Sequence, residues 1–223
     1  MIRCEHVSKQ FGAVRALSDV SLHIAPGERV AFVGSNGSGK TTLLRSIVGL
    51  VRVGGRVTID GIDVALTPEQ ALARVAYIPQ IAPPLDAPVR EVVRAFAALR
   101  GKTPDDVAGY AQRLGVELAK VAHTRFRDLS GGTKQKILAA MALAAQAQVL
   151  VCDEPTANLD AAARKAFFAE VDQRPPDAIL VLCSHRIEEV RQLVDRAVLL
   201  RDGRLVSDGR VEDQLAVGEV LDA

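Results

Sequence analysis

The stretch that decides the fold of this 223-residue chain is Gly34-Ser35-Asn36-Gly37-Ser38-Gly39-Lys40-Thr41-Thr42. It follows the β-prone run 29–33, which is typical of a buried strand, and it leads into a predicted helix. Its glycines allow consecutive backbone N–H groups to face inward, and the N-terminus of the helix adds partial positive charge. Residues 34–42 therefore predict a loop that binds the phosphates of a nucleoside triphosphate. In such a loop Lys40 reaches the β- and γ-phosphates, and the Thr41 hydroxyl can ligate Mg²⁺.

Two carboxylates follow a second apolar run at residues 149–152. The carboxyl ends of parallel strands meet at one edge of a sheet, so Asp153 and Glu154 are predicted to face the phosphate loop. We expect Asp153 to hold Mg²⁺ and Glu154 to act as the general base that activates water. Without the phosphate loop, the pair would fit equally well as two solvated acids at the end of a strand.

The remaining pattern indicates an α/β fold. The first 60 residues have the pattern of short strands, and residues 197–207 that of a closing hairpin around Asp202-Gly203. In the second half strands alternate with helices, which predicts a parallel sheet. The predicted elements of this half are 131–146, 149–153, 161–173, 179–183 and 186–195.

Between the two halves the composition changes. Four of the ten prolines fall within residues 79–88, which predicts a stiff, irregular connector. Apolar residues at helical spacing follow in 89–99 and 107–114. Residues 88–128 are therefore predicted to form a small helical insertion.

Composition excludes several classes of protein. A net charge of +1 and an aromatic content of 4% argue against a dedicated nucleic-acid binder. No apolar run approaches the roughly 18 residues of a membrane span, and the N-terminus lacks a signal-peptide core, so we expect a cytosolic chain without direct membrane insertion. Three cysteines, Cys4, Cys152 and Cys183, are far apart and odd in number, which fits neither a disulfide framework nor a zinc site. Cys152 and Cys183 stand inside apolar runs, which predicts buried thiols.

The segment Leu129-Ser130-Gly131-Gly132-Thr133 resembles the signature of the ATP-binding subunit of ABC transporters. The other motifs of that family follow in order over about residues 1–210. Gln80 resembles the Q-loop glutamine, 157–160 the D-loop, His185 the switch histidine, and Phe11 the ring that stacks on adenine. The chain departs from the family pattern at Thr133, Cys152, Ala157-Asn158 and Phe11, and none of these changes removes a catalytic group.

The resemblance implies one ABC ATPase domain over 1–223, a P-loop NTPase core with a parallel sheet and an N-terminal antiparallel β part. The RecA-like core would comprise 1–79 and 129–223, and the helical subdomain with its Q-loop connector 80–128. ATP and Mg²⁺ are implied as cofactors, with Gln80 on Mg²⁺ or the attacking water and His185 on the γ-phosphate. Two copies would pair head-to-tail around two ATPs, each nucleotide contacted by the opposing Ser130, Gly131, Gly132 and Asp160.

The implied function is an ATP-hydrolysing motor for a separate membrane-spanning permease, peripheral on the cytoplasmic face of the inner membrane. Its compact length and Lys134-Gln135-Lys136 resemble ABC-2 type subunits, which favours export. The alternative within the family is a non-transport ATPase that acts on ribosomes or chromosomes. A P-loop kinase or GTPase would leave the signature and His185 unexplained.

Overall fold

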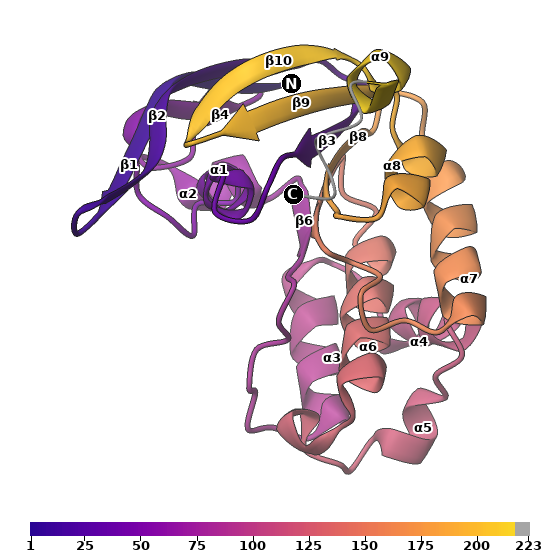
Figure 1. Cartoon of the computed structure of the whole chain (residues 1–223). Helices are drawn as coiled ribbons and strands as arrows, with labels where there is room; N and C mark the ends of the chain where they lie inside the picture. Colours follow the sequence, from indigo (N-terminus) through magenta and orange to yellow (C-terminus); the bar gives the residue numbers. More distant parts are fainter. Residues whose placement is uncertain (217–223) are drawn as a thin grey trace. The chain divides into compact units, whose positions relative to one another are not determined.

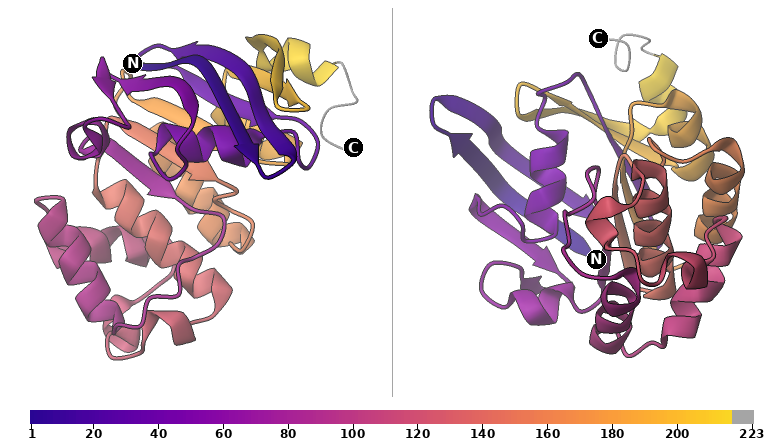
Figure 2. Two further views of the ribbon diagram at one scale, coloured as in Figure 1. Left: turned by 90° about the vertical axis from the view of Figure 1, so that its left-hand side faces the viewer. Right: turned by 90° about the horizontal axis from the view of Figure 1, so that it is seen from below.

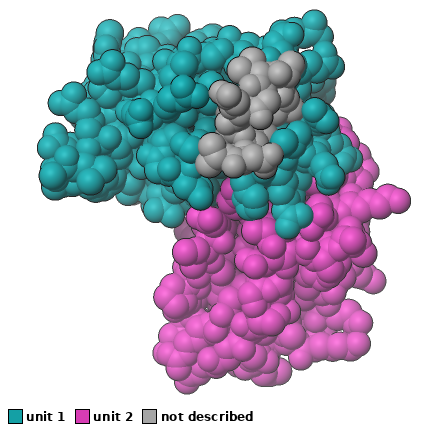
Figure 3. All heavy atoms as spheres, viewed as in Figure 1, with its two compact units in different colours: residues 1–77, 148–153, 175–223 teal, residues 78–147, 154–174 magenta. Residues whose placement is uncertain are grey.

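The computed structural model describes residues 1–216, which divide into two compact units. The first comprises residues 1–77, 148–153 and the described residues from 175 onward, and the second comprises 78–147 and 154–174 (Figure 3). The second unit is larger than the helical subdomain predicted at 80–128. The reason is that the helix at 131–144 packs against helices of that segment, and the helix at 161–172 packs against it in turn.

The first unit contains a mixed sheet (Figure 1), whose strands in chain order are β3 (Arg29–Val33), β6 (Val75–Ile78), β7 (Val149–Asp153), β8 (Ile179–Cys183), β9 (Arg196–Arg201) and β10 (Arg204–Arg210). Their order across the sheet is β10-β9-β3-β8-β7-β6. β3 pairs in parallel with β8 and β9, and β7 pairs in parallel with β8, which confirms the predicted parallel sheet. The hairpin expected at 197–207 is confirmed as the antiparallel pair β9–β10.

A second sheet of this unit is antiparallel and consists, in spatial order, of β2 (Val14–Ile24), β1 (Ile2–Phe11), β4 (Gly54–Ile59) and β5 (Ile62–Asp63). β1 and β2 are 10 and 11 residues long, so the expectation of short strands is wrong for this hairpin. Register shifts interrupt the pairing between Cys4 and Val7 and again between Val7 and Lys9. Such irregularities break the strict alternation of apolar and polar residues by which a long strand is found in a sequence.

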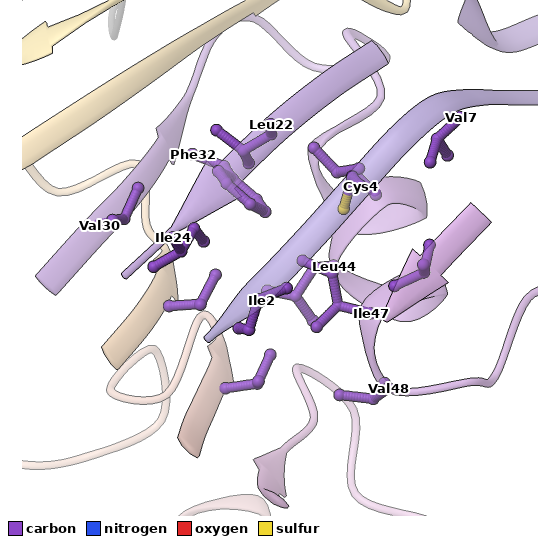
Figure 4. Packing of buried hydrophobic residues seen from close by; sticks show 14 of the residues in the cluster. Ile2, Cys4, Val7, Leu22, Ile24, Val30, Phe32, Leu44, Ile47 and Val48 are labelled. Carbon is purple, nitrogen blue, oxygen red and sulfur yellow. The ribbon is translucent and has the colours of Figure 1, made fainter. Parts of the chain in front are cut away.

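The helix α1 (Lys40–Ile47) packs between the two sheets. It contacts β1, β2 and β4 on one side and β7 and β8 on the other (Figures 1 and 2). Leu44 and Ile47 of this helix join Ile2 and Phe32 in the buried core (Figure 4). Because α1 begins directly after the phosphate loop, this core fixes the position of the loop.

Three further helices complete the first unit: α2 (Pro68–Leu72), α8 (Ile187–Leu193) and α9 (Val211–Ala216). The three cysteines are buried, and none of them forms a disulfide bond within residues 1–216. Burial raises the pKa of the Cys4 thiol to about 12. Among residues 1–216, no helix is both long and apolar enough to cross a lipid bilayer.

The second unit is built from helices, which in chain order are α3 (Val89–Leu99), α4 (Pro104–Arg113), α5 (Leu118–Val121), the 3₁₀ helix η1 (Phe126–Asp128), α6 (Gly131–Ala144) and α7 (Ala161–Asp172). α6 packs against α3, α4 and α7. A capping box starts α4, because Thr103 Oγ1 accepts from the Asp106 N–H at 3.2 Å and the Asp106 carboxylate accepts from the Thr103 N–H at 2.7 Å.

Candidate active site

The predicted phosphate loop lies between β3 and α1, as the sequence indicates. Two of its glycines are required by close approach of other backbone. A Cβ on Gly34 would lie 2.2 Å from the Leu200 carbonyl oxygen, and one on Gly39 would lie 2.5 Å from that of Ala16. Both glycines also have positive φ, 141° and 106°. The loop is therefore shaped by its contacts with β2 and β9.

The loop has the chemistry to bind phosphate. Lys40 Nζ donates to the Gly34 and Ser35 carbonyl oxygens at 2.6 and 2.8 Å, which holds the ammonium group over the loop. α1 has no acidic residue in its first turn and no side-chain cap, so its N-terminal N–H groups have no side-chain competitor for an anion. Ser38 Oγ is buried and has no hydrogen-bond partner among the residues the structure describes. These features fit a triphosphate.

Thr41 and Asp153 meet at the start of α1. Thr41 Oγ1 lies 3.4 Å from Asp153 Oδ1, and Asp153 is buried at the end of β7. Burial raises the pKa of the Tyr77 phenol, and the charge of the Asp153 carboxylate raises it further. A hydroxyl and a carboxylate are hard oxygen ligands, so the pair fits Mg²⁺ that is also held by phosphate oxygens.

His185 follows β8 and is exposed. The residues before and after His185, Ser184 and Arg186, are held by hydrogen bonds that were not predicted from the sequence. Ser184 Oγ donates to the Glu189 carboxylate at 2.9 Å and accepts from the Arg186 N–H at 3.1 Å. A buried Ser–Glu pair five residues apart has no distinctive sequence pattern, although Glu189 in the first turn of α8 is an ordinary helix-start signal.

Phe11, the candidate for adenine stacking, lies at the tip of the β1–β2 hairpin and pairs with Val14. Its side chain is 50% exposed, and Lys9 Nζ lies 4.9 Å from the ring centroid. One face of the ring thus carries a cation, and a half-exposed ring offers surface for a nucleobase.

The other candidate residues belong to the second unit. Ser130 is the N-cap of α6, since its Oγ accepts from the Thr133 N–H at 3.2 Å. Ser130 and Gly131 are exposed, and the first turn of α6 carries no acidic residue. The start of α6 is therefore an accessible N-terminus with the same preference for anions as α1.

Gln80 and Glu154 also belong to the second unit. Gln80 is exposed just after β6, and Glu154 is half-buried just after β7. Glu154 has φ of 51°, a left-handed conformation that is strained for a residue other than glycine. Such strain persists only where the surroundings hold the backbone.

Two neighbouring residues of α6, both missed as site residues, connect it to these segments. Gln135 Nε2 donates to the Pro79 and Pro155 carbonyl oxygens at 3.3 and 3.2 Å. Lys136 Nζ donates to the Asp160 carboxylate at 2.6 Å, and this bond lowers the pKa of that carboxyl group. Asp160 is therefore the N-cap of α7 and an ion-pair partner of α6.

The structure thus brings the candidates together in two sets. Lys40, Thr41 and Asp153 converge in the first unit, which also carries Phe11 and His185. The second unit carries Gln80, the Ser130–Gly132 segment, Glu154 and Asp160, and α6 links all of its segments.

Comparison with known proteins identifies the family. Residues 17–157 match the family described as ABC transporter. The chain is 37% identical to the ribose import ATP-binding protein RbsA 2 of Streptomyces avermitilis, with 100% of this chain and 48% of the relative covered. It is 34% identical to the zinc import ATP-binding protein ZnuC of Cereibacter sphaeroides, with 90% and 79% covered. The chain spans about half the length of the ribose-import relatives.

Solved structures agree with this assignment. An ATP-binding subunit of an ABC transporter superposes with a TM-score of 0.85 at 25% identity, covering 100% of this chain and 95% of the other. A dimeric ATP-binding cassette in a post-hydrolysis state with ADP and Pi superposes with a TM-score of 0.81 at 25% identity, covering 95% and 99%. The chain belongs to the ABC transporter family. Within it, the chain is an ATP-binding domain that hydrolyses ATP.

Proposed function

We propose that this chain is the motor subunit of a transporter, in which two copies pair head-to-tail around two ATPs and drive a separate membrane-spanning permease. The observation that carries this proposal is that two helices of one chain, α1 and α6, start without an acidic residue in the first turn, which suits both starts to an anion. α1 begins at the phosphate loop, whereas α6 begins at the exposed Ser130–Gly132 segment. A second copy gives each ATP a phosphate loop from one chain and an α6 start from the other.

The phosphate loop holds the nucleotide. Backbone N–H groups of residues 34–42 and Lys40 bind the β- and γ-phosphates, while the exposed face of Phe11 stacks on adenine. Thr41 and Asp153 would hold Mg²⁺, which neutralises negative charge on the phosphate oxygens. Their 3.4 Å separation supports this role.

Hydrolysis is assigned to the carboxylate of Glu154, the residue that follows Asp153 in the sequence. Glu154 accepts a proton from a water molecule as the water oxygen bonds to the γ-phosphorus, and the bond from that phosphorus to the β–γ bridging oxygen breaks. ADP and inorganic phosphate result. Gln80 orients the water, and His185 donates a hydrogen bond to the γ-phosphate.

The surface of residues 80–100 fits a membrane-protein partner. Ile81 and Leu99 are 77% and 85% exposed, and Arg90 and Arg94 are exposed on α3. A segment that exposes both apolar and cationic side chains would receive a loop that carries both apolar and acidic residues. This would place the chain on the cytoplasmic face of the inner membrane, bound through its permease.

The direction of transport stays a prediction. Export is expected from the resemblance to ABC-2 type subunits, but relatives of this chain are named for the import of ribose and of zinc. The cargo pocket belongs to the permease, so the proposal extends to the motor role alone.

A nucleotide-dependent pull-down tests the transporter assignment. Tagged Glu154→Gln protein is incubated with ATP and detergent-solubilised membranes of the source cell, and bound proteins are identified by mass spectrometry. We expect a polytopic membrane protein that is retained with ATP and lost when Ser130→Arg is added. Retention of ribosomal or chromosomal proteins instead would favour the non-transport alternative.

A variant pair tests the docking surface. Reversing both charges, Arg90→Glu with Arg94→Glu, should abolish capture of the permease while the basal ATPase rate stays within about twofold of wild type. Reversal of the charge at Arg113 on α4, which forms an ion pair with Glu170 on α7, serves as the control. Equal loss of capture and basal hydrolysis in the double variant would contradict the docking assignment.

A further inference from the structure

Gln135 is a buried glutamine whose amide group connects three functional segments. It lies on α6, five positions after Ser130, and its side chain is 1% exposed. Its Nε2 atom donates to the carbonyl oxygen of Pro79, the residue before Gln80, at 3.3 Å. The same atom donates to the carbonyl oxygen of Pro155, the residue after Glu154, at 3.2 Å.

The chemistry of these two bonds fixes the orientation of the amide. A carbonyl oxygen only accepts hydrogen bonds, so the NH₂ end must face both Pro79 and Pro155. Each of its two protons then has its own acceptor. Removing the donor would leave the buried Pro155 carbonyl oxygen and the part-buried Pro79 carbonyl oxygen without it, and an unsatisfied buried acceptor costs more than its bond contributes to stability.

The bond to Pro155 bears on the geometry of Glu154. Glu154 has φ of 51°, and the residue before a proline is sterically restricted as well. A donor on the Pro155 carbonyl therefore helps to hold the turn in which the Glu154 carboxylate is presented. α6 also approaches this turn closely elsewhere, because a Cβ on Gly132 would lie 2.9 Å from the Asn158 carbonyl oxygen.

We infer that Gln135 is a positioning residue that couples the two ATP sites of the dimer, an inference that rests on the proposed head-to-tail arrangement. In that arrangement Ser130–Gly132 contact the ATP bound by the partner, whereas Gln80 and Glu154 act on the ATP in the chain's own loop. α6 is a continuous helix of 14 residues, so a shift at its start moves Gln135 with it. Engagement of one ATP thereby sets the position of the residues that act on the other.

The test compares substitutions at this position. Gln135→Met keeps the length of the side chain, is a good helix former and suits a buried site, but removes both donors. We expect kcat to fall about tenfold and the Hill coefficient for ATP to fall from about 2 to about 1, with ATP affinity of the monomer unchanged. Gln135→Glu places a carboxylate against two carbonyl oxygens and should lower kcat further.

Gln112→Leu is the matched control, because Gln112 is an exposed glutamine on α4 of the same unit. It should leave both kinetic parameters unchanged. A Hill coefficient that stays at its wild-type value in Gln135→Met, a wild-type coefficient of 1, or loss of the whole fold in both Gln135 variants would overturn the inference. The dimer itself is checked separately in the Glu154→Gln background, so failure of the sandwich and failure of the coupling give different results.

Discussion

Lys40 shows how a single residue closes the phosphate loop. Its ammonium group bonds to the carbonyl oxygens of Gly34 and Ser35, which are the loop's own acceptors. These bonds keep the charge at the position where the β- and γ-phosphates are predicted to bind. Preformed charge of this kind stabilises a transition state without reorganisation.

Lys40→Ala should therefore abolish hydrolysis. We expect kcat to fall by at least about 100-fold, because one charged donor to the transferred phosphate is lost. Steady-state phosphate release measures the effect. Lys165→Ala, at an exposed position on α7, is the control and should keep wild-type activity. Substantial turnover by Lys40→Ala would contradict the assignment of the phosphate loop.

The cysteine thiols offer a second test at the residue scale. Burial raises the pKa of Cys4 to about 12, and Cys152 and Cys183 are buried as well. At pH 8 the Cys4 thiolate is then scarce, and it is the thiolate that reacts. We expect a thiol reagent to modify Cys4 rapidly only after unfolding in denaturant. Rapid labelling of Cys4 in the native protein, located by peptide mass spectrometry, would show that the β1–β2–β4 core opens readily.

At the scale of elements, helices and strands with a regular apolar pattern were predicted correctly from the sequence. The helix predicted at 161–173 is found at Ala161–Asp172, and the strand predicted at 179–183 is found with the same bounds. The β1–β2 hairpin was mistaken for short strands because its register shifts disturb the alternation of side chains.

Contacts within the candidate site were predictable where a local motif or the shared edge of a parallel sheet brings the residues together, as it does for Thr41 and Asp153. Lys40 and Thr41 follow the glycines of their own loop, so their roles are local. Gln135 acts on carbonyl oxygens at positions 79 and 155, far away in the sequence, and no local pattern marks such a contact. Roles that depend on long-range backbone acceptors require the structure.

Stability can be tested on the helix α1 and the residues just after it. Leu44 is fully buried on α1, whereas Leu50 is 63% exposed. Leu44→Ala should lower the free energy of unfolding by about 2–5 kcal/mol, since it leaves a cavity in the core between the sheets. Leu50→Ala should change that free energy by less than about 0.5 kcal/mol. Urea unfolding of both variants measures the difference, and equal effects would contradict the described packing of α1.

At the scale of the whole molecule, the two units carry complementary parts of the proposed reaction. In the proposal the first unit holds the nucleotide on its phosphate loop, and the second unit, which contains no phosphate loop, presents the exposed start of α6. In the proposed dimer, the ATP on the phosphate loop of one copy would also contact the α6 start of the other copy. Solved structures of similar fold include a dimeric cassette with ADP and Pi, which supports this account.

The most direct test of the head-to-tail dimer is the oligomeric state of Glu154→Gln in the presence of ATP and Mg²⁺, measured by sedimentation velocity. Without its general base the variant should bind ATP and not cleave it, so we expect a stable dimer that dissociates when ATP is removed. Ser130→Arg in the same background should remain monomeric while each monomer still binds ATP. A Glu154→Gln protein that binds ATP and stays monomeric at every concentration would contradict the head-to-tail dimer.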